Sequence, residues 1–326
     1  MCGIKTKDKR MNKILITGAA GNLGGLLANY LKDSNLHLNL MTHKRDVSSS
    51  LERLSNVSVY KADLANKESL TPALRDVDTV VHFAGILFKH NPEKFLPITN
   101  TQYFTNLVEK AIENKVKKII LISFPHVEGE TTPENPSKGI LNGKPISMHA
   151  TTRLEEEILL FKTGDETNIE TVSLRLGMVY GKGILMIDTA RWFGKYNILG
   201  IWKKPTWIHL ISIPDYLEAT KQAIIKENIE GIYHIGDEGK QTLQEFLDSA
   251  TKHWGYRKPV RMNLKIIMFV AKLFEIFSFL FGTKSPLTKD FIKIGMVSYY
   301  GDTLRMRKEL LSELKYKTYK DGIETL

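Results

Sequence analysis

The feature that most constrains the fold is a short apolar strand that runs directly into closely spaced glycines. Residues 13–24 read Lys-Ile-Leu-Ile-Thr-Gly-Ala-Ala-Gly-Asn-Leu-Gly, and an amphipathic helix is predicted over about 22–32. Gly18 permits a sharp turn, Gly21 lets the backbone approach a pyrophosphate, and Gly24 lets the helix pack on the strand. The helix then directs its free amides and positive dipole end at the phosphates. The combination predicts a dinucleotide site rather than a plain tight turn.

Composition limits the classes of protein that remain. The 326 residues, 42% of them hydrophobic, can form one large or two modest cores. The single cysteine, Cys2, excludes a disulfide framework and a four-cysteine metal site, and it favours a reducing compartment, so we expect a cytoplasmic protein. Residues 1–12 are basic and lack an apolar stretch, which predicts a disordered leader and no signal peptide. No metal-binding motif is present.

The formal net charge of +10 raises the question of nucleic-acid binding. The lysines are scattered over predicted helix faces and turns, and no basic stripe interleaved with aromatic residues is present. We therefore predict a solvated basic surface and no nucleic-acid partner. Anionic substrates or an acidic membrane surface stay open as alternatives.

Apolar runs alternate with helical patterns through the first half of the chain. Strands are predicted at 13–17, 36–41, 57–60, 79–83, 118–123 and 170–175, with helices near 22–32, 67–75, 95–114 and 148–162. This alternation is typical of an α/β fold with a Rossmann-like, doubly wound parallel sheet. We predict a dinucleotide-binding domain over 13–175 and a smaller, mainly helical substrate-binding lobe over 176–326. A long loop over 128–147 is a candidate lid, and the run Glu155 to Glu157 is expected to face solvent.

Several motifs, in this order, resemble the extended short-chain dehydrogenase/reductase family, which contains nucleotide-sugar epimerases and 3β-hydroxysteroid dehydrogenase-like reductases. They are the Thr-Gly-x-x-Gly-x-x-Gly start, Ala62-Asp63-Leu64, residues 80–85, Asn100, residues 175–181, 211–215 and 231–236. The resemblance implies a nicotinamide cofactor bound by the following residues. They are Gly18, Ala20, Gly21, Asn22, Leu23, Gly24, Asp63, Leu64, Phe83, Ala84, Gly85 and Asn100. For Asp63, a turn-forming role is the alternative.

The end of the second predicted strand bears on the choice between NAD and NADP. An acidic side chain there would accept a hydrogen bond from the ribose 2′-hydroxyl, whereas a basic one would pair with a 2′-phosphate. The sequence has His43, Lys44 and Arg45, with no acid before Asp46. NADP(H) is therefore favoured, and NAD(H) stays open.

The catalytic pattern departs from the family. Members carry a Tyr-x-x-x-Lys pair on one helix face, with a hydroxyl after the fifth strand. At the matching positions this chain has His149 and Arg153, and the hydroxyl position falls on Phe124, with Ser123 one residue earlier. Imidazole titrates near neutral pH, so His149 is a candidate acid/base. Arg153 is a candidate for holding a ribose hydroxyl or a substrate phosphate.

Two further regions bear on the substrate. By the same resemblance, Arg175 is expected to support the substrate or the active-site loop, with a surface ion pair as the alternative. Residues 264–281 form a very apolar stretch interrupted by lysines, too short in uninterrupted apolar length for a spanning helix. We expect it to lie at a membrane interface, to cover a lipid-like substrate, or to form a lobe-core or homodimer contact.

Taken together, the residues predict an atypical oxidoreductase acting on a small apolar or sugar-derived carbonyl or alcohol. Two alternatives stay open. One is a non-catalytic NAD(P)-binding redox sensor or scaffold, in which the proton relay is lost. The other is a nucleotide-sugar epimerase or dehydratase, which would retain NAD tightly and show no net redox change.

Overall fold

A seven-stranded sheet forms the centre of the computed structural model, which describes residues 12–85, 91–281 and 288–326. Its strands lie in the order β11 (Gly231–Ile235), β6 (Glu170–Leu176), β5 (Lys118–Ser123), β4 (Thr79–His82), β1 (Lys13–Thr17), β2 (His37–Thr42) and β3 (Val57–Lys61). All neighbouring pairs are parallel. The predicted doubly wound α/β fold is confirmed.

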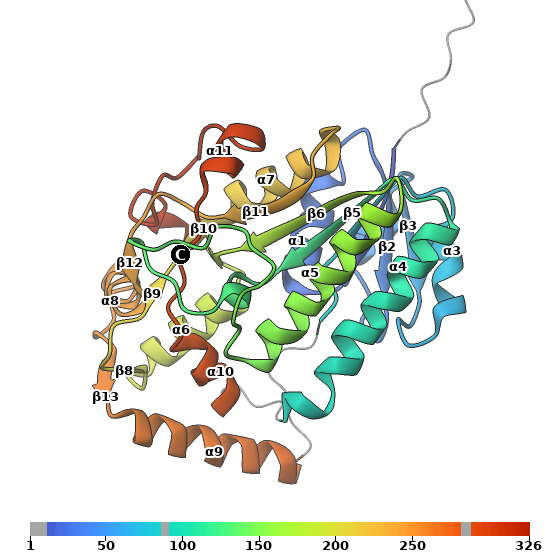
Figure 1. Ribbon diagram of the computed structural model, residues 1–326. Helices are drawn as coiled ribbons and strands as arrows, with labels where there is room; N and C mark the ends of the chain where they lie inside the picture. The colour runs from blue at the N-terminus through green and yellow to red at the C-terminus, as the bar shows by residue number, and fades with distance from the viewer. Residues whose placement is uncertain (1–11, 86–90, 282–287) are drawn as a thin grey trace, which may run out of the picture.

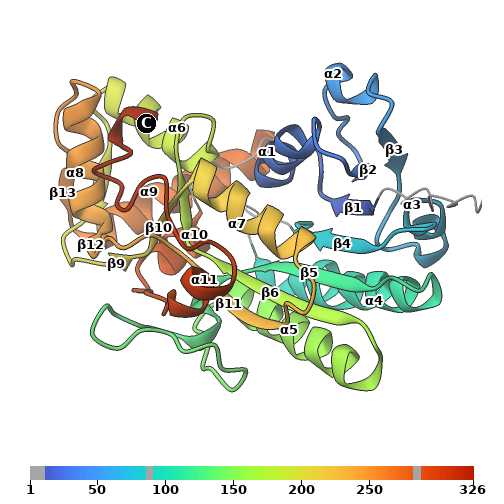
Figure 2. The ribbon, with the colours of Figure 1, turned by 90° about the horizontal axis from the view of Figure 1, so that it is seen from above.

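Helices cover both faces of this sheet (Figure 2). One face packs against α1 (Asn22–Leu31) and α7 (Ile213–Ile225), and the other against α3 (Thr71–Leu74), α4 (Tyr103–Glu113) and α5 (Met148–Glu166). Ile14 and Ile16 of β1 enter the core on one side, while Leu15 enters the core on the other. This alternation follows from the pleat of a strand that is buried on both faces.

The remaining elements form a lobe beside the sheet (Figure 1). Its short strands pair as β7 (Met178–Tyr180) with β10 (Leu210–Ser212), β8 (Gly200–Trp202) with β13 (Val260–Met262), and β9 (Trp207–Ile208) with β12 (Gln241–Thr242). Its helices are α6 (Leu185–Lys195), α8 (Leu243–His253), α9 (Leu264–Phe281) and α10 (Lys289–Gly295). No helix in the described ranges is long and apolar enough to cross a membrane.

The short helices complete the chain. They are α2 (Ser49–Glu52), α11 (Leu304–Glu309), the 3-10 helices Lys67–Leu70, Pro92–Lys94, Pro125–Glu128 and Ile323–Thr325, and a π-helix, Pro97–Gln102. The lobe boundary predicted at 175/176 needs correction, because β11 and α7 lie beyond it in sequence but pack with the sheet. The chain enters the lobe, returns to complete the sheet with β11, and then enters the lobe again.

Candidate functional site

The predicted glycine turn lies at the carboxyl end of β1. Gly18 has a φ of +67°, and a Cβ added to Gly21 or Gly24 would lie 2.8 or 2.6 Å from the Gly18 carbonyl oxygen. These positions admit only glycine without movement of the backbone. Helix α1 begins after Gly21 with no side-chain cap, so its first amides are available to an anion. The turn therefore fits the pyrophosphate of a dinucleotide.

The neighbouring predicted residues on α1 contact the rest of the protein. The Asn22 side chain donates to the Gly183 carbonyl at 2.7 Å and accepts from the Leu185 amide at 3.2 Å. The Leu23 carbonyl accepts from the Tyr216 hydroxyl at 3.1 Å. Ala20 is half-buried in the turn. The start of α1 is thus held against the lobe and against α7, which fixes the turn in place.

The end of β4 lies directly beside this turn. The Thr17 hydroxyl oxygen lies 2.9 Å from His82 Nδ1 and accepts from the Phe83 amide at 3.2 Å and the Ala84 amide at 3.4 Å. Burial, followed by the charge of Arg153, lowers the pKa of His82 to about 3. Because His82 stays neutral, it serves here as a structural link between β1 and β4.

The residues after β2 lie farther along the carboxyl edge of the sheet. His43 Nε2 lies 3.6 Å from Asp63 Oδ2, and both side chains are about half exposed. Asp63 Oδ1 also accepts from the Ala65 amide at 3.0 Å, so Asp63 forms the alternative turn contact as well. Lys44 and Arg45 are exposed and form no ion pair with any described residue, whereas Asp46 is 2.9 Å from Lys61 Nζ. Two exposed cations therefore lie just beyond the end of β2.

Helix α5 carries three polar side chains near the carboxyl edge of the sheet, where the glycine turn and the end of β4 lie. We call these residues, His149, Arg153 and Glu156, the cleft cluster. A Cβ added to Gly85 would lie 3.0 Å from Arg153 Nη2, so the guanidinium lies against the end of β4. Arg153 Nη1 donates to Glu156 Oε2 at 2.5 Å, and the buried Glu156 Oε1 has no hydrogen-bond partner in the part of the chain that the structure describes. Burial raises the pKa of Glu156 to about 7, and the attraction of Arg153 limits the rise.

His149 lies one helical turn before Arg153, near the N-terminus of α5, which Ser147 caps. Its side chain is 9% exposed, and Nδ1 lies 3.0 Å from Asp290 Oδ2 on α10. Both ring nitrogens are buried and neither has a hydrogen-bond partner among the described residues, so the contact with Asp290 is an ion pair only when the imidazole is protonated. An imidazole backed by a carboxylate on one nitrogen and free on the other is suited to move a proton.

Asn100 lies in the π-helix that precedes α4. Its Nδ2 donates to the Thr152 hydroxyl at 3.0 Å, while its buried Oδ1 has no partner in the described ranges. Thr152 occupies the turn of α5 between His149 and Arg153. A π-helix often marks a functional site, and the free amide oxygen is a further acceptor close to the cleft cluster.

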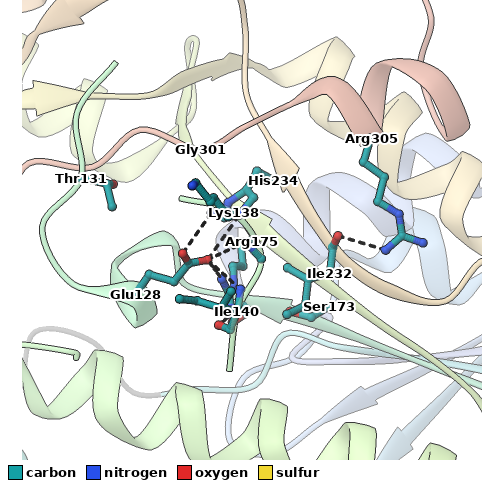
Figure 3. A network of polar contacts seen from close by, with 12 residues as sticks. Glu128, Thr131, Lys138, Ile140, Ser173, Arg175, Ile232, His234, Gly301 and Arg305 are labelled. Carbon is teal, nitrogen blue, oxygen red and sulfur yellow. Dashed lines mark hydrogen bonds and ion pairs between the residues drawn. The ribbon is translucent and has the colours of Figure 1, made fainter. Parts of the chain in front are cut away.

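Glu157, which follows Glu156 on α5, belongs to a different group. We call Glu128, Glu157 and Arg175 the loop cluster, and Figure 3 shows Glu128 and Arg175 lying together. Arg175 Nη2 donates to Glu157 Oε2 at 2.6 Å and to the Ile140 carbonyl at 2.8 Å, and its Nη1 pairs with Glu128. Glu128 also accepts from the amides of Lys138 and Gly139. Burial opposes ionisation of Glu128, but His234, these amides and Arg175 outweigh it and lower its pKa to about 2.

The loop cluster bears on three expectations. Ser123 donates its hydroxyl proton to Glu157 Oε1 at 2.5 Å, so its side chain supports this cluster. Arg175 is fully buried and pairs with Glu128 and Glu157, which agrees with support of the loop and excludes the alternative of a surface ion pair. Glu156 and Glu157 are fully buried, so the prediction that they face solvent was wrong. Glu128 accepts from backbone amides of residues 138–140, which ties the 128–147 loop to itself, and its role as a lid stays a prediction.

Two functional candidates, Asp290 and Glu156, were not predicted. Asp290 lies far along the chain from His149, and no local pattern connects them. Glu156 follows Arg153 at the i,i+3 spacing of an ion pair, which was a usable signal. Within the described ranges, no group of His, Cys, Asp or Glu is arranged to hold a metal ion.

The chain is similar to several known proteins. The model of the NAD dependent epimerase/dehydratase family matches residues 14–193. A uronate dehydrogenase from Pseudomonas syringae pv. tomato is 27% identical over 177 residues, which is 54% of this chain and 63% of that protein. The chain thus spans about three fifths of that relative. The dTDP-4-dehydro-6-deoxyglucose reductase of Escherichia coli is 25% identical over 303 residues, 81% of this chain and 91% of that protein.

Among solved structures, the UDP-glucuronic acid 4-epimerase of Bacillus cereus in complex with UDP-glucuronic acid and NAD has the same fold. The TM-score is 0.75 at 22% identity, over 96% of this chain and 97% of that one. The fold and the family-model match agree with the motif order in the sequence. The chain belongs to the NAD dependent epimerase/dehydratase family, among the extended short-chain dehydrogenases/reductases.

Proposed function

We propose that the protein is an NADP(H)-dependent oxidoreductase that interconverts a carbonyl and an alcohol on a small sugar-derived or apolar substrate. The observation that carries this proposal is the contact of Arg153 with Gly85, because it brings the cleft cluster to the glycine-lined crevice. Membership of the family supports a nicotinamide cofactor. The relatives named as uronate dehydrogenase and sugar reductase support hydride-transfer chemistry.

The residues that would hold the cofactor are those of the glycine turn and of the β4 end. The amides that begin α1 would bind the pyrophosphate, and Ala84 and Gly85 would border the nicotinamide half. Lys44 and Arg45 would pair with a 2′-phosphate, since neither is engaged by a described carboxylate. When bound, the nicotinamide ring supplies or accepts the hydride. NAD(H), which appears with the Bacillus cereus epimerase, is the alternative cofactor.

His149 is proposed to supply the proton. In the reducing direction, Nε2–H donates to the carbonyl oxygen as the carbon receives the hydride, so that the C=O π bond becomes one C–H and one O–H bond. Asp290, 3.0 Å from Nδ1, stabilises the imidazolium before transfer, and solvent returns the proton afterwards. Such a positioned acid contributes about 10²–10⁴-fold in rate. Arg153, held by Glu156, would bind a ribose hydroxyl or a substrate phosphate.

The test is a fluorescence titration of the purified protein with NADPH and NADH, followed by turnover on a panel of uronic acids, keto-sugars and apolar ketones. We expect NADPH to bind more tightly, and Gly21→Asp to abolish binding by filling the phosphate position with a carboxylate. Asn29→Asp is the matched control, because it adds the same carboxylate at an exposed position near the other end of α1. If neither nucleotide binds, or if the Gly21 variant binds normally, the proposal is wrong.

A second function has support from the comparisons. The relatives and neighbours include nucleotide-sugar epimerases, in which the alcohol is oxidised and reduced again on one enzyme. Tightly retained NAD in the purified protein and product without net change in NADH would favour this reaction. Tight nucleotide binding with no turnover of any panel member would instead favour a redox sensor or scaffold.

A further inference from the structure

Helix α9 presents an apolar stripe that the proposed reaction does not use. Ile266, Phe269, Leu273 and Ile276 recur at helical spacing and are 50, 60, 50 and 45% exposed, whereas Ile267 and Ala271 on the opposite side are buried. The helix lies along the outer edge of the lobe, on the far side of the molecule from α11 (Figure 1). A contiguous apolar stripe of this kind on a helix marks an interaction surface.

The apolar surface continues from α9 to α6. Phe274 of α9, together with Trp192, Phe193 and Ile198, lines a hollow of about 490 Å³. Trp192 and the nearby Tyr196 are each more than half exposed, at 54 and 55%. Tryptophan and tyrosine with one wet end and one apolar face are enriched at the level of lipid headgroups.

The charges beside the stripe are mostly positive, although Asp188, which accepts from the Gly183 amide at 3.2 Å, also lines the hollow. Lys265 and Lys272 are exposed along one side of it, while Glu275 is occupied by the Lys289 backbone amide at 2.8 Å and by Lys289 Nζ at 3.5 Å. Lys203 and Lys204 follow β8, whose last residue, Trp202, pairs with Met262 just before α9 begins. The exposed lysines therefore border both the length and the N-terminal end of the stripe.

We propose that this surface docks on an anionic phospholipid bilayer, with α9 lying in the plane of the interface. A cationic border beside a continuous apolar face is the arrangement that binds such a surface, because burial of the apolar side chains adds to attraction of the lysines. The net charge of +10 disfavours a second copy as the occupant, since self-association brings surfaces of the same sign together. Docking does not depend on the proposed reaction.

The test is flotation of the full chain with vesicles of phosphatidylcholine alone and of equal parts phosphatidylcholine and phosphatidylglycerol. We expect flotation with the anionic vesicles only, weakening as salt is raised. The double variant Phe269→Glu/Leu273→Glu should lose at least about tenfold in partitioning. Leu304→Glu, on α11 and 74% exposed, makes the same kind of change on the opposite side and should float as the wild type does.

Lys265→Gln/Lys272→Gln should reduce partitioning by about thirtyfold, since each lysine near an anionic surface contributes about 1 kcal/mol. Melting temperature and NADPH affinity of every variant establish that the fold and the proposed cofactor site are intact. Failure of the wild type to float, or equal flotation of the Phe269/Leu273 double variant, overturns the proposal. A dimer in solution that this double variant dissociates, without vesicle binding, would show that a second copy covers the surface.

Discussion

Glu156 and Glu157 are adjacent on α5 and both fully buried, yet they belong to groups with opposite properties. Glu157 accepts from Ser123, Ser173 and Arg175, so both of its oxygens are satisfied. Among the described residues, Glu156 has one hydrogen-bond partner, Arg153, and its Oε1 has none. A fully satisfied buried network rigidifies a fold, whereas incomplete satisfaction carries a cost that functional sites often retain. We infer that the loop cluster holds the structure and that the cleft cluster performs the chemistry.

The largest expected effect comes from breaking the loop cluster. Arg175→Met leaves Glu128 and Glu157 buried without their cation, which should lower the free energy of unfolding by about 3–5 kcal/mol. Urea denaturation measures this loss. Lys162→Met removes an exposed partner of Glu166 and should cost less than about 1 kcal/mol. Equal losses in the two variants would remove the distinction between a structural cluster and a surface pair.

The raised pKa of Glu156 should make the free energy of unfolding depend on pH. Its folded pKa is raised from 4.5 to about 7, so between these values the folded state binds more protons than the unfolded state. Its contribution is complete below pH 4.5 and is lost as pH rises through 7, by at most about 3 kcal/mol. Glu156→Gln should remove this decline when denaturation curves are compared from pH 4.5 to 7.5. An unchanged slope in the variant would contradict a raised pKa.

The preference for NADPH over NADH tests the proposed role of the exposed Lys44 and Arg45. Lys44→Ala/Arg45→Ala should weaken NADPH binding by about thirtyfold and leave NADH binding unchanged, because only the 2′-phosphate distinguishes the two nucleotides. The measurement is the same fluorescence titration. Lys61→Ala, whose lysine already pairs with Asp46, is the neighbouring control. Parallel weakening of both nucleotides would show a general electrostatic effect and no 2′-phosphate site.

Asp290 should have the smallest effect, because it acts through His149. Asp290→Asn removes the carboxylate that lies beside Nδ1 of His149, so kcat should fall by about tenfold. The KM for NADPH should not change, and Asp290→Glu should restore much of the rate. A loss confined to stability, with kcat unchanged, would make Asp290 a structural residue.

The sheet was predictable because its strands are buried on both faces and therefore read as continuous apolar runs. The predicted strands 13–17 and 118–123 match β1 and β5, and α9 matches the predicted 264–281. The place of β11 in the sheet was not predictable from local pattern, since it follows the excursion into the lobe. The same limit applies to Arg175 and Asp290, because their partners lie far away in sequence. Glycine positions, in contrast, depend on local backbone geometry and were identified directly.

The most direct test of the central claim is His149→Ala, measured for turnover and for NADPH affinity on one preparation. We predict that kcat falls by at least about a hundredfold, while the dissociation constant for NADPH and the free energy of unfolding stay within about twofold and 1 kcal/mol of the wild-type values. Turnover that survives the substitution would contradict the claim that the cleft cluster supplies the proton, and would return the function of this site to nucleotide binding alone.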